Sequence, residues 1–210
     1  MPLESPPPAD EGSGLPVTPP PGARRSDRTL LDETTRPEAP GAAGRSYTAR
    51  ERSSAQHLVD VHDHLRAELE DVRGLVEQVL AAAASPVAAR SAINVMTMRQ
   101  QNWSLGAYCQ SYCRLVTGHH SLEDVAMLPH LRSADPALAP VVDRLEAEHR
   151  VIHDVLEELD RALVRYVGEP SGSAGLQDAV DLLTDTLLSH LAYEERQLVE
   201  PLARFGYGFG

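Results

Sequence analysis

The 210-residue chain contains no lysine, and aromatic residues make up only 4% of it. Its formal net charge is -12, and its arginines form no run that could follow a phosphate backbone. We therefore do not expect a nucleic-acid partner. Strand formers such as Ile, Phe and Tyr are scarce, whereas Leu, Ala and Val are abundant. This composition favours an all-α fold.

Long apolar runs and a cysteine framework are also lacking. No stretch approaches the roughly 18 apolar residues of a membrane-spanning helix, and the first residues lack a basic region followed by an apolar one. The two cysteines, Cys109 and Cys113, lie four residues apart in a segment with a helical pattern, which is not a disulfide framework. We expect a cytoplasmic protein without a membrane segment. Both cysteines are expected to pack as small apolar residues, with a redox pair as the alternative.

Proline is concentrated at the start of the chain. Ten of the 16 prolines fall within the first 40 residues, among Gly, Ser and mixed charges. Such sequence buries too little apolar surface to offset the entropy of ordering it. We therefore expect residues 1–47 to form a disordered tail and residues 48–210 to form the folded domain. The tail is interpreted as a spacer, and a docking role with an unidentified protein partner is the alternative.

After residue 50, four stretches show the 3.6-residue apolar period of helices that bury one face. The start of the second helix is placed between Ser91 and Trp103. The expected buried stripes are Leu58, Val61, Leu65, Leu69, Val72, Val76 and Val79; Leu105, Cys109, Tyr112, Val116, His119, Glu123 and Met127; Val142, Leu145, His149, Ile152, Leu156, Leu159 and Leu163; and Leu176, Val180, Leu183, Leu187, His190, Glu194 and Leu198. Long helices with short connections predict an antiparallel up-down-up-down four-helix bundle.

Histidine interrupts or adjoins the apolar stripe of every expected helix. Residues i and i+4 lie on one helix face, so a pair at this spacing can converge on one point of the core. Burying several imidazoles and carboxylates is unfavourable unless a metal ion compensates for all of them together, and this mixture suits iron, manganese or zinc. The pairs at this spacing are His119 and Glu123, His149 and His153, and His190 and Glu194.

Two histidines of the first helix compete for the interior position. His62 adjoins the stripe that contains Leu65, whereas His64 shares a face with charged side chains. We choose His62 as the interior residue and interpret His64 as solvated. His57 and His130, at helix ends or on polar faces, are expected at the surface.

The spacing and order of these residues resemble the hemerythrin-like, HHE cation-binding family. The resemblance covers about residues 55–205, and an HxxxE element before Leu-Pro and a closing HxxxEE before Pro make it specific. The segments that carry it are HDHLR at 62–66, HHSLEDVAMLP at 119–129, EHRVIH at 148–153 and HLAYEERQLVEP at 190–201.

The resemblance implies a non-heme diiron centre, with two iron ions favoured over manganese or zinc. His120 either binds metal or faces a neighbouring helix. Glu195 competes with Glu194, because oxygen-carrying hemerythrins place this carboxylate five residues after the histidine. We also expect Asp124 to orient an imidazole of the centre. With His120 counted among them, the eight implied ligands are His62, His119, His120, Glu123, His149, His153, His190 and Glu194.

By this resemblance, the protein binds or reacts with O2, peroxide or nitric oxide. Glu in place of Asp on the last helix, and the HH pair on the second, count against reversible oxygen carriage. Two alternatives stay open. One is a diiron enzyme that consumes peroxide or nitric oxide with participation of Tyr112, although core packing is the simpler interpretation of this tyrosine. The other is an iron- or oxygen-responsive sensor or interaction protein.

Overall fold

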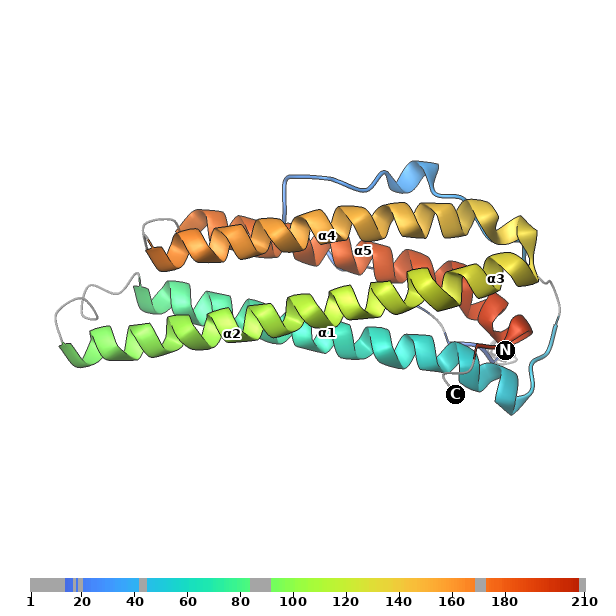
Figure 1. Cartoon of the computed structure of the whole chain (residues 1–210), viewed down its shortest axis with the longest axis horizontal. Helices are drawn as coiled ribbons and strands as arrows, with labels where there is room; N and C mark the ends of the chain where they lie inside the picture. Colours follow the sequence, from blue (N-terminus) through green and yellow to red (C-terminus); the bar gives the residue numbers. More distant parts are fainter. Residues whose placement is uncertain are drawn as a thin grey trace, which may run out of the picture.

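The computed structural model describes residues 14–16, 18, 21–41, 45–83, 92–168 and 173–207, which contain no β-strand. The long helices are α1 (Ala49–Ala83), α2 (Ala92–Leu122), α4 (Ala139–Gly168) and α5 (Ser173–Phe205), and the short α3 (Leu128–Ala134) continues α2. They lie side by side and alternate in direction (Figure 1). The predicted all-α, up-down-up-down four-helix bundle is therefore confirmed. The second helix begins at the early end of the predicted interval.

A π-helical turn, η3 (Glu123–Met127), joins α2 to α3. The backbone N–H of Leu128 donates to the carbonyl of Glu123, so this turn holds an additional residue. Pro129 follows directly, and in a regular α-helix its ring would clash with the carbonyl of Val125. The wider turn relieves that clash. After α3, the Asp135 side chain accepts a hydrogen bond from the Ala137 N–H and caps the short 3-10 helix η4 (Pro136–Leu138), which leads into α4.

The two largest apolar clusters fill the ends of the bundle, and the predicted stripes supply most of the larger one and less than half of the smaller one. Every stripe residue is buried except Val61 and His119, which are half-buried. The large apolar cluster extends from Leu65 to Val79 on α1 and includes matching stretches of α2, α4 and α5. The small apolar cluster packs α3 and the start of α4 against the end of α5. The interior histidines lie between these two clusters.

Part of the proline-rich N-terminal sequence lies against the bundle. The sequence predicts a disordered tail through residue 47; of this range, the described residues 21–41 lie along α4 and α5 (Figure 1). Asp185 accepts hydrogen bonds from the backbone N–H groups of Arg25 and Ser26 at 2.8 to 3.1 Å, and Leu31 is buried. Polar contacts with α4 and α5 side chains therefore hold a segment that has little apolar surface. Residues 1–13, 17, 19–20 and 42–44 of the predicted tail lie outside the described residues.

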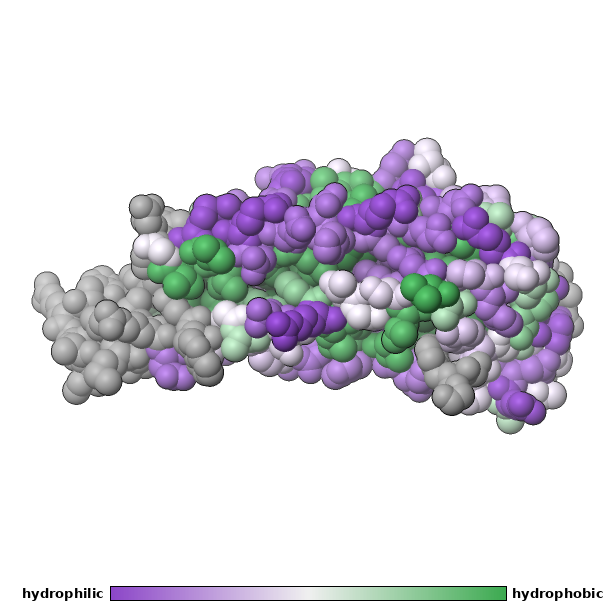
Figure 2. Space-filling model, viewed as in Figure 1, coloured by the Kyte–Doolittle hydropathy of each residue, from purple (hydrophilic) through white to green (hydrophobic). Residues whose placement is uncertain are grey.

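The outer surface is mixed in character. Polar side chains dominate over α4 in Figure 2, and hydrophobic ones gather where the second half of α2 lies beside α1. Leu122 is 60% exposed and Val125 is 81% exposed. Among the residues that the structure describes, no helix is both long and apolar enough to cross a membrane.

Candidate metal centre

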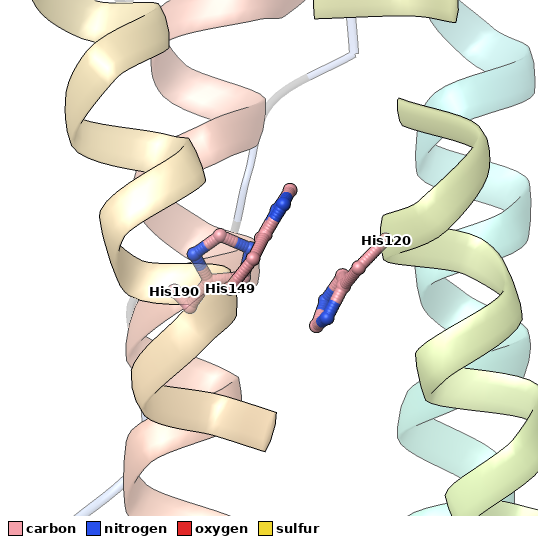
Figure 3. A group of neighbouring side chains, drawn as sticks. All are labelled: His120, His149 and His190. Carbon is pink, nitrogen blue, oxygen red and sulfur yellow. The ribbon is translucent and has the colours of Figure 1, made fainter. Parts of the chain in front are cut away.

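Seven side chains from α1, α2, η3, α4 and α5 meet in the middle of the bundle, and their donor atoms form two groups. Within each group the donor atoms lie within 4.8 Å of one another. The first donor group is His120, His149 and His190, and the second is His62, His119, Glu123 and Glu194. Figure 3 shows the first group, with His120 on α2 and the other two histidines on the neighbouring helices. The structure thus brings together seven of the eight predicted ligands.

Glu123 lies between the two donor groups. Its Oε1 atom is 3.1 Å from Nε2 of His119 in its own group, and its Oε2 atom is 3.6 Å from Nε2 of His149 in the other. The π-helical turn begins at this residue, and such turns are frequent at functional sites. A carboxylate placed in this way can contact a cation in each group.

Glu194 occupies the corresponding position on α5. Its Oε2 atom is 3.4 Å from Nε2 of His190 and 3.7 Å from Nε2 of His62, so it also faces both groups. Glu195 has a different place, because its Oε1 atom contacts Nδ1 of His62 at 2.9 Å and Nη2 of Arg66 at 2.7 Å. The structure therefore places Glu194 among the donor atoms and Glu195 behind His62.

Three imidazoles each have a carboxylate behind them. An ionised carboxylate only accepts hydrogen bonds, so the ring carries a proton on Nδ1, and a ring that is neutral then has its lone pair on Nε2. In each case this Nε2 atom faces the other donor atoms, and metal-binding histidines usually have a partner of this kind. Asp124, which we expect from the sequence to orient an imidazole, is one of these carboxylates. The pairs, with Nδ1–oxygen distances, are His62 and Glu195 (2.9 Å), His149 and Asp124 (2.7 Å), and His190 and Glu148 (3.1 Å).

The atoms that face the middle of the site have unmet hydrogen-bonding capacity. Nε2 of three histidines and both carboxylate oxygens of two glutamates are buried without a hydrogen-bond partner. A buried unpaired polar group costs about 1 to 3 kcal/mol. A bound cation would satisfy these atoms together, so the donor set fits a metal centre. The residues are His120, His149, His190, Glu123 and Glu194.

Burial keeps two imidazoles of the site, His119 and His120, neutral. Burial, together with the positive charge that His62 can carry, lowers the pKa of His119 to about 3. Burial and the neighbouring imidazoles, His149 first, lower the pKa of His120 well below its ordinary value. Both rings therefore keep a lone pair for a metal ion at neutral pH.

The two central carboxylates respond to burial in opposite directions. Burial raises the pKa of Glu123 well above its ordinary value, and the charge of Glu194 adds to this effect. Burial also opposes ionisation of Glu194, but the adjacent His190 and His62 outweigh it and hold the pKa of this carboxyl below its ordinary value. A cation between them would favour the ionised form of both.

Glu148 is a functional residue that the sequence interpretation missed. Burial alone would raise its pKa, but hydrogen bonds from His190, Arg36 and Arg144 lower it to about 2. The available signal was its register, since Glu148 follows Leu145 by three residues and precedes Ile152 by four. A carboxylate at a stripe position requires a partner. The periodicity could not indicate that Arg36, from a distant segment, supplies one.

His153, the eighth predicted ligand, lies away from both donor groups. Its side chain is 57% exposed, and its Nε2 atom is 3.5 Å from Oε1 of Glu157 on the outer face of α4. Four residues rotate a helix by about 40° more than one full turn. For His153 this extra rotation is directed away from the buried stripe, which continues from His149 to Ile152, and so it places His153 on the outer face. His120 completes the first donor group instead, and we leave His153 out of the proposed ligand set.

The other singled-out residues lie outside the donor groups. The Tyr112 hydroxyl donates to the carbonyl of Leu65 at 3.2 Å, within the large apolar cluster. Cys109 is buried, Cys113 is half-buried, and both are free thiols. As expected, three histidines, His57, His64 and His130, are exposed.

A largely apolar cavity of about 610 Å³ between α1 and α2 borders the second donor group. Its walls include Val61, Leu115 and Met127, and His119 and Glu123 also line it. The volume lies in the usual range of small-molecule sites, about 300 to 1,000 Å³. Its walls come mainly from α1 and the second half of α2, where hydrophobic side chains gather in Figure 2. The cavity gives a small molecule a route to the donor atoms.

One of three comparisons with known proteins gave a match, and it agrees with this geometry. Neither a search of curated proteins nor a search of solved structures gave a match. A family model, the hemerythrin HHE cation binding domain, matches residues 53–202, a range that contains both donor groups and the carboxylates behind them. The chain therefore belongs to the hemerythrin HHE cation-binding family.

Proposed function

We propose that this protein is a cytoplasmic non-heme diiron protein that binds or reacts with O2, peroxide or nitric oxide. The observation that carries the proposal is the pair of donor groups joined by Glu123 and Glu194, each of which faces both groups. Five imidazoles and two carboxylates form a donor set that suits iron, and it also accepts manganese or zinc.

Two ferrous ions, when bound, would supply electrons for the reduction of O2 or peroxide. The chain's own residues fix the donors and limit access. Asp124, Glu148 and Glu195 hold three imidazoles with Nε2 directed inward. The two apolar clusters on either side keep bulk water from the donor atoms. The cavity beside His119 and Glu123 admits a small uncharged molecule.

The proposal is tested with protein loaded with ferrous iron without oxygen and mixed rapidly with O2, hydrogen peroxide or nitric oxide. We expect a change in the near-ultraviolet and visible spectrum with at least one of the three. The Glu123→Ala variant, given the same iron, should not show it, because a donor shared by both groups is missing. A wild-type protein that holds iron but reacts with none of the three would contradict the proposed ligand class.

The same experiment separates binding from turnover. Stable, stoichiometric oxygenation would indicate a binding protein. Continued consumption of peroxide or nitric oxide without loss of iron would indicate a diiron enzyme of the catalase or peroxidase type. The position of Tyr112, hydrogen-bonded within the large apolar cluster, gives no support to its participation in such a reaction.

A further inference from the structure

The N-terminal segment, residues 21–41, reaches the candidate metal centre through one arginine. The Arg36 side chain is only 5% exposed, and its Nε and Nη2 atoms donate to the two carboxylate oxygens of Glu148 at 2.8 and 2.9 Å. Its guanidinium carbon also lies 4.6 Å from the centre of the Tyr193 ring. Glu148 in turn accepts from Nδ1 of His190 at 3.1 Å. One carboxylate therefore connects the segment to an imidazole of the first donor group.

Arg144 strengthens this connection from the bundle side. Its Nε atom donates to Oε1 of Glu148 at 2.7 Å, and its Nη2 atom donates to the backbone carbonyl of Asp32 at 2.6 Å. Glu148 is buried, so loss of either arginine leaves its charge incompletely paired. The bidentate geometry from Arg36 also fixes the orientation of the carboxylate, which a single contact would not.

Further contacts attach the segment to the part of α5 that carries His190 and Glu194. The attached α5 residues lie next to these two donors in the sequence or within three positions of them. Each contact uses a different polar group of the segment, so the segment follows α5 closely over this stretch. The contacts are Ser189 Oγ to Glu33 Oε1 (2.6 Å), Tyr193 hydroxyl to Pro37 carbonyl (2.8 Å), and Ala39 N–H to Gln197 Oε1 (2.6 Å).

We propose that docking of residues 21–41 and metal binding are coupled, with Arg36 as a positioning residue that orients His190 through Glu148. The inference rests on the proposed function, because it assumes that the first donor group holds a metal ion. Coupling between two binding events is reciprocal. The factor by which the docked segment tightens metal binding is therefore the factor by which bound metal favours docking. The segment thus responds to metal occupancy.

The affinity test uses the full chain and two variants in the same segment. Arg36→Gln removes the bidentate contact with Glu148. Arg28→Gln is the matched control, because Arg28 pairs with Glu158 at 2.6 Å on the outer surface and its side chain is 52% exposed. Ferrous iron affinity is measured by chelator competition without oxygen. We expect about tenfold weaker binding in Arg36→Gln, the lower end of the effect of outer-shell partners, and affinity within about twofold of wild type in Arg28→Gln.

Amide hydrogen exchange measures docking directly. The N–H groups of Arg25, Ser26 and Ala39 donate to side chains of α5, so they exchange only when the segment leaves the bundle. In the wild type, iron should slow the exchange of these N–H groups by about the factor that separates the iron affinities of the wild type and Arg36→Gln. In Arg36→Gln, exchange should be fast with or without iron, while unchanged circular dichroism shows that the helices are intact.

Three outcomes distinguish this inference from the proposed function. Weaker iron binding in Arg36→Gln, together with iron-dependent exchange in the wild type, supports the coupling. An iron affinity of Arg36→Gln within about twofold of wild type, or exchange that iron does not alter, overturns the coupling and leaves the metal centre in place. A wild-type protein that takes up no iron overturns both.

Discussion

In the large apolar cluster, side chains such as Leu159 and Leu183 are fully buried and need no partner, whereas the adjoining donor groups bury imidazoles and carboxylates that lack one. Burial of a leucine contributes about 1.5 to 3 kcal/mol. Each unpaired polar group of the site has a cost of similar size. The apolar clusters therefore stabilise the bundle, whereas the unpaired polar groups in its middle destabilise the metal-free protein.

The largest effect is expected when one donor is removed and the variant is compared with one that lacks a histidine outside the site. His120→Ala should weaken metal binding by at least about tenfold, because the first donor group then has only two imidazoles. His153→Ala should leave metal content unchanged, since that side chain is 57% exposed and its Nε2 atom lies 3.5 Å from Oε1 of the surface residue Glu157. Elemental analysis of both variants, purified in parallel, measures the difference. Metal loss in His153→Ala alone would reverse the assignment.

Removal of a side chain from the large apolar cluster should reduce the stability of the protein without loss of metal. Leu159→Ala removes a fully buried side chain from the large apolar cluster and should lower the free energy of unfolding by about 2 to 5 kcal/mol. Metal bound per folded chain should not change, because Leu159 lies outside both donor groups. Urea denaturation gives the first quantity and elemental analysis the second. A variant as stable as wild type would show that this cluster does not hold the fold.

A substitution at Glu123 should have opposite effects with and without metal. In metal-free protein, Glu123→Leu removes a buried carboxylate with two unpaired oxygens and should raise the free energy of unfolding by about 1 to 3 kcal/mol. In metal-loaded protein, it should lower the melting temperature, because a shared donor is lost. Glu157→Leu, on the surface at 54% exposure, is the control and should stay within about 0.5 kcal/mol of wild type. Destabilisation of the metal-free Glu123→Leu protein would indicate that the carboxylate serves the fold.

The smallest effect is expected at the cavity beside the second donor group. Gly118 lines this cavity, and a Cβ at this position would meet no neighbouring atom within 4 Å. Gly118→Leu should therefore fill the cavity and slow the reaction with a small ligand several-fold, with metal content unchanged. Gly106→Leu on the same helix, also with free space at its Cβ and outside the cavity lining, is the matched control. Equal rapid-mixing rates in both variants would exclude this route.

The sequence predicts the bundle well because helix periodicity is a local property. Each of the four apolar stripes repeats over many helical turns, so a small error in the assigned helical phase does not change which face is buried. The same periodicity identifies His62 over His64, since these two residues differ by about 200° around the helix axis. The same rule predicts the pairs His119 with Glu123 and His190 with Glu194. The first pair lies within the second donor group, and the second pair joins the two groups.

What the sequence could not predict depends on contacts between distant segments. The choice between His120 and His153 depends on how α2 and α4 are rotated toward each other, which periodicity fixes only to within a fraction of a turn. The contact of Arg36 with Glu148 joins residues 112 positions apart. No local pattern indicates this contact, because the sequence around an arginine in a proline-rich segment is the same whether the arginine is solvated or buried in an ion pair.

The most direct test of the account is the metal content of the full chain, purified without added metal, together with its near-ultraviolet and visible spectrum in air. We predict about two iron ions per chain, one for each donor group, and the absorption of oxygen-bridged ferric iron. One zinc ion per chain, or no metal, would contradict the diiron assignment and leave the buried imidazoles and carboxylates without the ligand that this account requires.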